Sequence, residues 1–477
     1  MAIMIPFSLG RYIMSENKGL NVSVKSFLGA ILVILVLMIG TYLLTFFIPA
    51  GEYARIVDEA GNTVIVSTGS FRYTQGSLTF GKFLLSPILV LGAEGGGTII
   101  AIIIFLLVIG GVFSALETCG LMEYMLQRLV HRFAAHKYRL LAVIPLFFLS
   151  MGAFIGSFEE CVPLVPIVVA LAVSLGWDPV TGLGMSLLAA GCGFASGVCN
   201  PFTIGVAQSL AGLPMFSGLW LRLVSAVLIY FLLLGFLYRH AKKHDTGIVS
   251  DREDFCPVPT LDKALKRFAG ILGVGIALVL ASPFIPALQD LTMIIVAVMF
   301  LAAGLAGTAT AGMKGKTLAV TFGKGMSAIF PAVLMICMAS SVKYILTESK
   351  ILDTLLYTAV QTLDGMPKWG IVLAIYGIVL GMNFFIASGS AKAFLLIPLI
   401  VPMAQLFGIP AQLCMVAFAF GDGFSNVFYP TNAALLIALG LADVSYGSWV
   451  KYSWKFQALN LLLTSGILLF GLWIGYC

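Results

Sequence analysis

Two stretches of apolar sequence, interrupted by glycine, proline and polar residues, are diverged copies of each other in this chain of 477 residues. The first copy covers residues 152–218 and the second covers residues 387–447. The residues that recur in register are Pro166, Gly176, Pro201, Gly218 and Trp220 in the first copy and Pro398, Gly408, Pro430, Gly447 and Trp449 in the second. Interrupted hydrophobic segments at corresponding places in two halves are typical of the binding region of secondary transporters. The repeat therefore predicts two related halves built around one central site.

The composition places the chain in the membrane. Sixty per cent of its residues are hydrophobic, 10% are charged and the mean hydropathy is +1.05, which is typical of a polytopic membrane protein. The eight cysteines form no CxxC pair, and the sequence contains no HExxH, Walker A or dinucleotide-binding motif. We therefore expect neither an enzyme nor a transition-metal site, and the four histidines at 131, 136, 240 and 244 are interpreted as surface charge.

The repeat divides the chain into a first half over 1–238, a cytoplasmic linker over 239–267 and a second half over 268–477. Each half is expected to contain one hairpin and one broken helix: hairpins at 139–176 and 369–407, and broken helices at 180–213 and 411–442. A hairpin arm of about 15 residues reaches only about 22 Å, against a hydrocarbon core of roughly 30 Å. The expected fold is an all-α polytopic membrane protein, an inverted repeat with two opposed re-entrant hairpins and two broken helices.

The remaining elements follow from hydropathy and periodicity. We expect a small β-hairpin within 51–80, a helical unit over 82–118 broken at its glycine run, and a basic amphipathic surface helix over 121–137. Other expected membrane spans are 26–48, 219–238, 268–286, 290–306, 326–346 and 448–474, with an amphipathic stretch at 350–366. Treating each hairpin as entering and leaving on one side puts nineteen of the 27 Lys and Arg residues in the cytoplasm and six outside. The N-terminus is then cytoplasmic.

Four motifs resemble those of a known family: GSFEECVPLVP, NPFTIGVAQSLAGLP, ASGSAKAFLLIP and FGDGFSNVFYPTNAALL. They are similar to the YfcC-type branch of the C4-dicarboxylate anaerobic carrier family, within the ion transporter superfamily of secondary carriers. The resemblance covers nearly the whole chain from about Phe47 onward. It implies a homodimer in which a transport domain, containing both hairpin tips and both helix breaks, moves against a scaffold domain. It also implies sodium coupling in many members and an amino acid or a dicarboxylate as cargo.

The first hairpin tip carries Ser157, Glu159 and Glu160. Ser157 and Glu160 have the spacing of a capping box, which would make both of them structural. Glu159 has no part in such a cap, and two adjacent carboxylates at membrane depth are costly enough to indicate function. The alternative is that these residues bind a substrate ammonium, a cation or a proton.

The second tip carries Lys392 behind Ser388 and Ser390. One interpretation of Lys392 is a permanent ion pair with Asp422 or with the glutamates of the first tip. The other is a counter-charge for a substrate carboxylate, with Ser388 and Ser390 donating at a helix N-terminus. Asp422 lies between two glycines and has no acidic counterpart in the first copy.

Polar residues at the two helix breaks are candidate ligands for a coupling ion, because hard cations prefer oxygen ligands. Helix packing through small and polar residues is the structural alternative. The candidate ion ligands are Asn200, Asn383, Asn426, Asn432 and Glu160, and Thr203 and Thr431 join the candidate substrate ligands.

Taken together, these features predict a secondary active transporter of the bacterial cytoplasmic membrane with an elevator-like mechanism. A pocket with both signs of charge suits an amino acid, including basic amino-acid exchange, better than a dianion. The alternatives are a sodium- or proton-coupled C4-dicarboxylate carrier and, more distantly, a passive channel. Sodium is the one cofactor that we consider, the expected partners are the lipid bilayer and a second copy of the chain, and no nucleic acid is expected.

Overall fold

The computed structural model describes residues 24–476 except 58–62, 66–69, 94–95, 134–135, 215, 248–256, 282–284, 286–291, 362 and 364. The polar leader over 1–23, and with it the orientation of the N-terminus, lies outside the described residues. So do the centre of the expected linker and the turn of the expected β-hairpin.

The N-terminal elements follow the sequence expectations closely. Helix α1 is Val24–Phe47, α2 is Phe80–Leu89 with a 3₁₀ turn η2 at Val90–Gly92, α3 is Gly96–Thr118 and α4 is Leu121–Phe133. Strands β1 (Gly51–Glu52) and β4 (Arg72–Tyr73) pair antiparallel, and β2 (Arg55–Val57) pairs antiparallel with β3 (Thr63–Ile65). The expected β structure within 51–80 is present as two short pairs, and the strands of the alternating stretch 62–74, β3 and β4, pair with β2 and β1 and not with each other.

The first repeat copy is built from short helical pieces. They are α5 (Lys137–Ser150), η4 (Met151–Ile155), η5 (Glu159–Leu164), α6 (Val165–Ser174), α7 (Pro179–Leu183), η6 (Gly184–Leu188), α8 (Ala189–Ser196), η7 (Pro201–Gly205), α9 (Val206–Leu210) and the long α10 (Leu219–Lys243). The turns η4, η6 and η7 are π-helical. Such wide turns are rare and are found frequently at functional sites. The break predicted within 180–213 is confirmed at residues 197–200, between α8 and η7.

The second half contains longer helices. They are α11 (Pro259–Ala281), α12 (Thr292–Thr310), α13 (Gly315–Ala328), α14 (Phe330–Glu348), α15 (Leu352–Gln361), α16 (Lys368–Phe385), α17 (Gly389–Leu406), α18 (Ala411–Asn426), α19 (Ala433–Leu441) and α20 (Tyr446–Trp473). Two boundaries differ from expectation. Helix α11 begins inside the predicted linker, and the predicted loop over 307–325 contains most of α13. Both segments are amphipathic enough to pack one face of a helix against α12 or α3, a tertiary contact that hydropathy does not reveal.

Eight helices among the described residues are long and apolar enough to cross a membrane. Together with the apolar side chains exposed along α1, α10 and α20, this makes the chain a multi-pass membrane protein. The arms of the second hairpin, α16 and α17, have 18 residues each. The estimate of about 15 residues per arm concerned the first hairpin, and re-entry of both hairpins stays a prediction.

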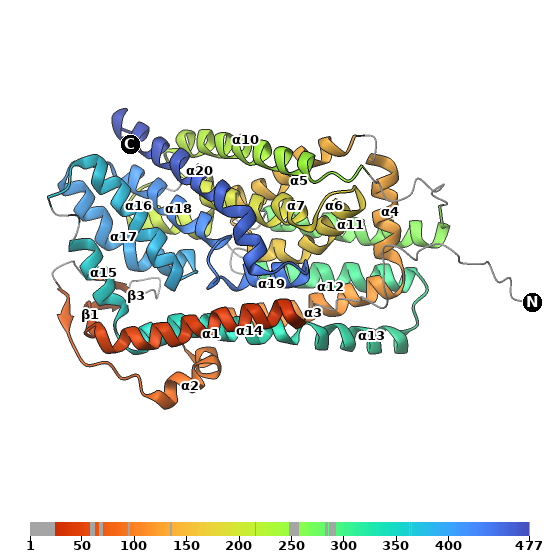
Figure 1. Cartoon of the computed structure of the whole chain (residues 1–477), viewed down its shortest axis with the longest axis horizontal. Helices are drawn as coiled ribbons and strands as arrows, with labels where there is room; N and C mark the ends of the chain where they lie inside the picture. Colours follow the sequence, from red (N-terminus) through yellow and green to blue (C-terminus); the bar gives the residue numbers. More distant parts are fainter. Residues whose placement is uncertain are drawn as a thin grey trace, which may run out of the picture.

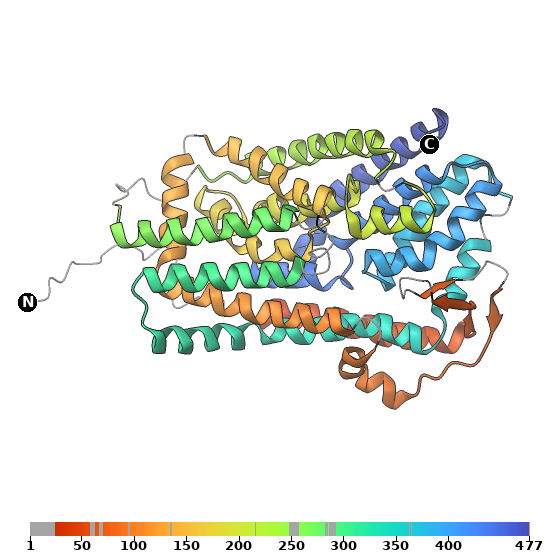
Figure 2. The same cartoon turned by 180° about the vertical axis from the view of Figure 1, so that it is seen from behind.

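The two copies point in opposite directions. Figures 1 and 2 show α4 lying across one end of the molecule and α15 lying at the other end. Hairpin α5–α6 starts near α4, whereas hairpin α16–α17 starts near α15 (Figure 1). The contacts are reciprocal, because α17 packs on α9 while η5 and α6 pack on α19, and α8 crosses α18 between them. This is the arrangement expected of an inverted repeat; the exact boundaries of the two halves stay a prediction.

A layer of helices lies beside this interlocked unit. Helix α1 packs on α14, and α3 packs on both α12 and α13. Both figures show this layer along one side of the molecule. Contacts between the layer and the interlocked unit include α14 with α16 and α19, and α1 with α19 and α20.

Where α8 crosses α18, the two backbones are too close at Gly423 to leave room for a side chain. A Cβ atom added to Gly423 would lie 2.2 Å from the Cα and 2.3 Å from the backbone nitrogen of Ala195. Backbone atoms cannot move aside as a flexible side chain can, so overpacking here costs about 1–3 kcal/mol. We expect Gly423→Ala to lower the unfolding midpoint in detergent, measured by thermal denaturation. Gly466→Ala in α20 is the matched control, since nothing lies within 4 Å of its Cβ position and alanine favours a helix. Equal midpoints for the two variants would contradict this account of the crossing.

Candidate functional site

The two hairpin tips and the first helix break meet in the interior of the interlocked unit. At the first tip, the backbone N–H of Cys199 donates to Ala153 at 3.0 Å, and the Cα of Gly156 faces the Asn200 side chain closely. At the second tip, a Cβ on Gly389 would lie 2.6 Å from Asp422 Oδ2 and 2.7 Å from the Thr203 methyl carbon. Residues about 190 positions apart in the chain therefore face one small region, as the sequence predicts.

Lys392 has a permanent partner in the protein. Its side chain and that of Asp422 are both fully buried, and Nζ lies 2.5 Å from Asp422 Oδ1. Nζ also donates to Asn383 Oδ1. Of the two interpretations of Lys392, the structure favours the ion pair with Asp422. Contact between Lys392 and the cargo stays an untested hypothesis.

The asparagines of the second break form one network around this pair. Asn383 Nδ2 donates to Ser425 Oγ at 2.6 Å and to Asn426 Oδ1 at 2.9 Å. Asn426 Oδ1 also accepts from Asn432 Nδ2 at 3.2 Å, and Asn432 Oδ1 caps α19 by accepting from Leu435 N–H. The side-chain oxygens of Asn383, Asn426 and Asn432 are thus occupied by protein donors in this structure.

The other buried side-chain oxygens of the region fall into two groups. Asn200 Oδ1 has a donor in the protein, because it accepts from Thr203 N–H at 3.3 Å. Among the buried oxygens without a hydrogen-bond partner in the described residues, five belong to the tips and breaks: Ser157 Oγ, Glu160 Oε2, Thr203 Oγ1, Asp422 Oδ2 and Thr431 Oγ1. Buried polar atoms are nearly always hydrogen-bonded, so such a concentration of acceptors indicates a place for a ligand.

The capping-box interpretation of the first tip is not what the structure shows. The chain enters η5 through Phe158, with no side-chain cap, and Ser157 Oγ has no partner. Because the arm begins as a tight 3₁₀ turn, Ser157 lies before the cap position and cannot reach the amides beyond it. Glu160 keeps one oxygen without a partner, and Glu159 is close enough to Asp422 for the two carboxylates to repel each other.

The second tip presents the N-terminus of α17. Ser388 is its N-cap, and its Oγ accepts from Ala391 N–H at 3.5 Å. Ser388 is exposed, and Ser390 in the first turn is half-buried. Gly389 at the start of α17 lies beside Asp422 Oδ2, which puts the partial positive charge of the helix N-terminus next to a carboxylate.

Arg222 is a buried charged residue that the sequence analysis did not propose for the site. Its side chain is fully buried in the first turn of α10. Nη2 donates to the carbonyls of Phe216 and Ser217 at 3.1 and 2.9 Å, which holds the loop after α9. The repeat could have drawn attention to Arg222, because it aligns with Lys451 and both basic residues follow a Gly-x-Trp motif.

Opposed hairpins, broken helices and buried charges around one point, in a multi-pass membrane protein, define a membrane transporter. The chain belongs to the C4-dicarboxylate anaerobic carrier family, whose model matches residues 28–472. This confirms the resemblance seen in the motifs.

Two curated relatives match most of the chain. It is 28% identical over 411 residues to the "Putative basic amino acid antiporter YfcC" of Escherichia coli strain K12, covering 80% of this chain and 79% of the relative. It is 24% identical over 390 residues to an uncharacterized protein of Haemophilus influenzae, covering 79% and 76%.

Two solved transporters also align with the fold. The YdaH transporter of Alcanivorax borkumensis has a TM-score of 0.46 and 18% identity, covering 94% of this chain and 98% of that one. MtrF of Neisseria gonorrhoeae, whose structure is described as illuminating a class of antimetabolite efflux pumps, has a TM-score of 0.45 and 14% identity, covering 92% and 94%.

Proposed function

We propose that this transporter is a secondary carrier that exchanges basic amino acids across the bacterial cytoplasmic membrane. The observation that carries the proposal is the charge of the site. Glu159, Glu160 and Asp422 contribute three carboxyl groups, and Lys392, already paired with Asp422, contributes an ammonium. An unbalanced negative charge in a membrane interior is costly unless a cation compensates it.

A basic amino acid fits the arrangement of acceptors and donors. Its α-ammonium would bind Asp422 Oδ2 and Thr203 Oγ1, two oxygens without protein partners. Its α-carboxylate would lie at the adjacent N-terminus of α17, where Ser388 and Ser390 stand and where partial positive charge favours anions. Its distal cation would be met by Glu159, Glu160 and Ser157 of the first tip.

A C4-dicarboxylate fits less well, because a dianion would approach an excess of carboxylates with no uncommitted lysine in the site. The printed name of the Escherichia coli relative, a putative basic amino acid antiporter, supports the same choice. Thr431 Oγ1, also without a partner, would complete the contacts to the ammonium side of the cargo.

The mechanism that we propose is elevator-like. The interlocked unit of hairpins and broken helices would move as the transport domain against the layer that contains α1, α3 and α12–α14, in a homodimer with a cytoplasmic N-terminus. Sodium is a proposed coupling ion at the first break, where the amide oxygen of Asn200 faces Gly156 of the first tip. The occupied asparagine oxygens of the second break argue for exchange as the main mode.

Counterflow in proteoliposomes tests the proposal. Vesicles are preloaded with unlabelled lysine, leucine, succinate or nothing, and uptake of labelled lysine is followed with and without a sodium gradient. We expect internal lysine to accelerate uptake several-fold and internal leucine and succinate to have no effect. A further increase of lysine uptake under an inward sodium gradient would support sodium coupling, and its absence would leave exchange alone. Acceleration of labelled succinate by internal succinate would replace the proposal with dicarboxylate transport. Uptake of lysine that no internal substrate accelerates would indicate a channel.

A further inference from the structure

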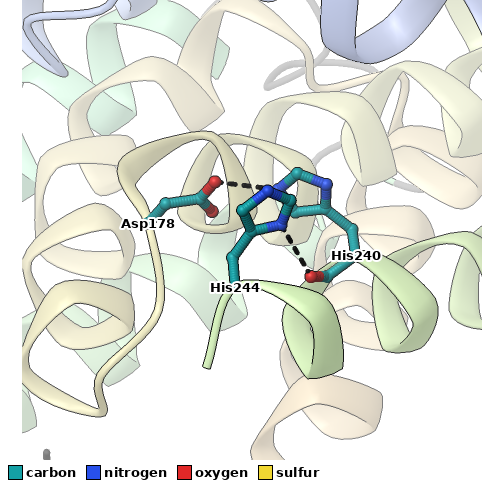
Figure 3. Close-up of side chains that lie close together, drawn as sticks. All are labelled: Asp178, His240 and His244. Carbon is teal, nitrogen blue, oxygen red and sulfur yellow. Dashed lines mark hydrogen bonds and ion pairs between the residues drawn. The ribbon is translucent and has the colours of Figure 1, made fainter. Parts of the chain in front are cut away.

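Two histidines and an aspartate form a cluster outside the site described above, where α7 begins and α10 ends (Figure 3). Asp178 is the N-cap residue of α7, and His240 and His244 lie one turn apart at the C-terminal end of α10. The nitrogen and oxygen atoms that could bind a metal all lie within 4.8 Å of one another. This arrangement is not used by the proposed transport site.

The hydrogen bonds of the cluster place a ring N–H of His240 against the Asp178 carboxylate and leave one ring nitrogen of His244 without a hydrogen. Asp178 Oδ2 lies 2.8 Å from His240 Nε2, while Asp178 Oδ1 accepts from Thr181 N–H at 3.0 Å. His244 Nδ1 lies 3.0 Å from the carbonyl oxygen of His240. A carbonyl only accepts, so Nδ1 of His244 carries the hydrogen and Nε2 has a free lone pair. A hydrogen bond from the second ring nitrogen to a carbonyl is what metal-binding histidines usually make.

The surroundings hold the two rings in place and attract a cation. The imidazoles of His240 and His244 stack with their centres 4.1 Å apart (Figure 3). The ring of Tyr452 packs edge-on against His240, with the ring centres 4.6 Å apart. The end of α10 carries the negative pole of the helix dipole, next to the Asp178 carboxylate. Asp178 and His240 are half-buried and His244 is exposed, so an ion can enter from solvent.

We propose that Asp178, His240 and His244 form a binding site for a divalent transition-metal ion of the zinc type. Two imidazole nitrogens and one carboxylate oxygen are ligands that zinc takes, with water in the fourth position. Calcium and magnesium prefer all-oxygen sites. Zinc would replace the proton shared by His240 and Asp178, and a small rotation of the exposed His244 would complete the site. The bound ion joins the start of the first broken helix to the end of α10.

Metal titration of the purified, tag-free full chain in detergent tests this site. Cobalt(II) serves as a coloured probe, and zinc is then added to displace it. We expect one zinc-displaceable cobalt ion per chain. His240→Ala and His244→Ala should each weaken metal binding by more than about 10-fold. Removing a residue that only hydrogen-bonds to a metal ligand already costs about that much, and removing the ligand itself should cost more. Asp178→Asn should weaken it too while keeping the helix cap, since asparagine is an equally good N-cap. His136→Ala is the matched control and should bind as the original chain does.

A second measurement separates metal binding from folding. Zinc should raise the unfolding midpoint of the original chain and of His136→Ala, and it should not raise that of His244→Ala, whose exposed side chain is not needed for folding. The proposal is overturned if the original chain binds no zinc-displaceable cobalt. It is equally overturned if His244→Ala and His240→Ala bind with unchanged affinity, or if His136→Ala loses binding to the same extent.

Discussion

Replacing Lys392 by glutamine is expected to lower the stability of the cargo-free protein by about 3–5 kcal/mol, the cost of breaking a buried ion pair from one side. Lys392 and Asp422 are both fully buried, with Nζ 2.5 Å from Oδ1. Without the ammonium, the Asp422 carboxylate is left charged and uncompensated between α17 and α18. Chemical denaturation in mixed micelles measures the loss.

The double variant Lys392→Gln with Asp422→Asn separates this pairing from a role of Lys392 in cargo binding. Because the two residues are directly coupled, the second change should restore much of the lost stability instead of adding to the loss. Lys455→Gln is the control, since Lys455 is exposed on α20 and should leave stability unchanged. If Lys392→Gln leaves the cargo-free protein as stable as this control but abolishes lysine binding, Lys392 faces the cargo and the ion pair does not carry its function.

Replacing Glu160 by glutamine is expected to have the opposite pattern, with cargo affinity lost and stability kept. Glu160 Oε2 is buried without a hydrogen-bond partner, so the substitution strands no protein group. If Glu160 meets the distal cation of the cargo, removing its charge should cost about 2–5 kcal/mol of binding free energy. The Kd for lysine should then rise roughly 30-fold or more.

Isothermal titration with lysine and counterflow of labelled lysine check this result. Glu123→Gln on α4 is the matched control, because Glu123 is exposed and accepts a hydrogen bond from Gln127 on the same helix. An unchanged Kd in Glu160→Gln would remove the first tip from the cargo site. The proposal would then depend on Asp422 and Thr203 alone.

The sequence by itself determined the class of fold and the segments that build the site. The repeat, the lengths of the apolar runs and the positions of glycine, proline and asparagine are local properties, and they indicated a broken helix within 180–213 and another within 411–442, where the structure has breaks at 197–200 and 427–432. Residue type and position also made Asp422, Lys392 and Asn383 candidates for the site. Boundaries were less predictable where a helix such as α13 is stabilised by packing on α3, since amphipathic segments of this length also occur in loops.

Only the tertiary structure decided which partner each polar group has. Lys392 could pair with Asp422, with the glutamates of the first tip or with the cargo, and its pairing with Asp422 depends on how α17 packs on α18. The first arm begins as a 3₁₀ turn without the capping box that its sequence suggests, and the packing of α10 buries the side chain of Arg222. His240 joined Asp178 across 62 positions of sequence. Partner choice depends on distances of a few ångströms between elements far apart in the chain, and these distances follow from packing, which no local pattern encodes.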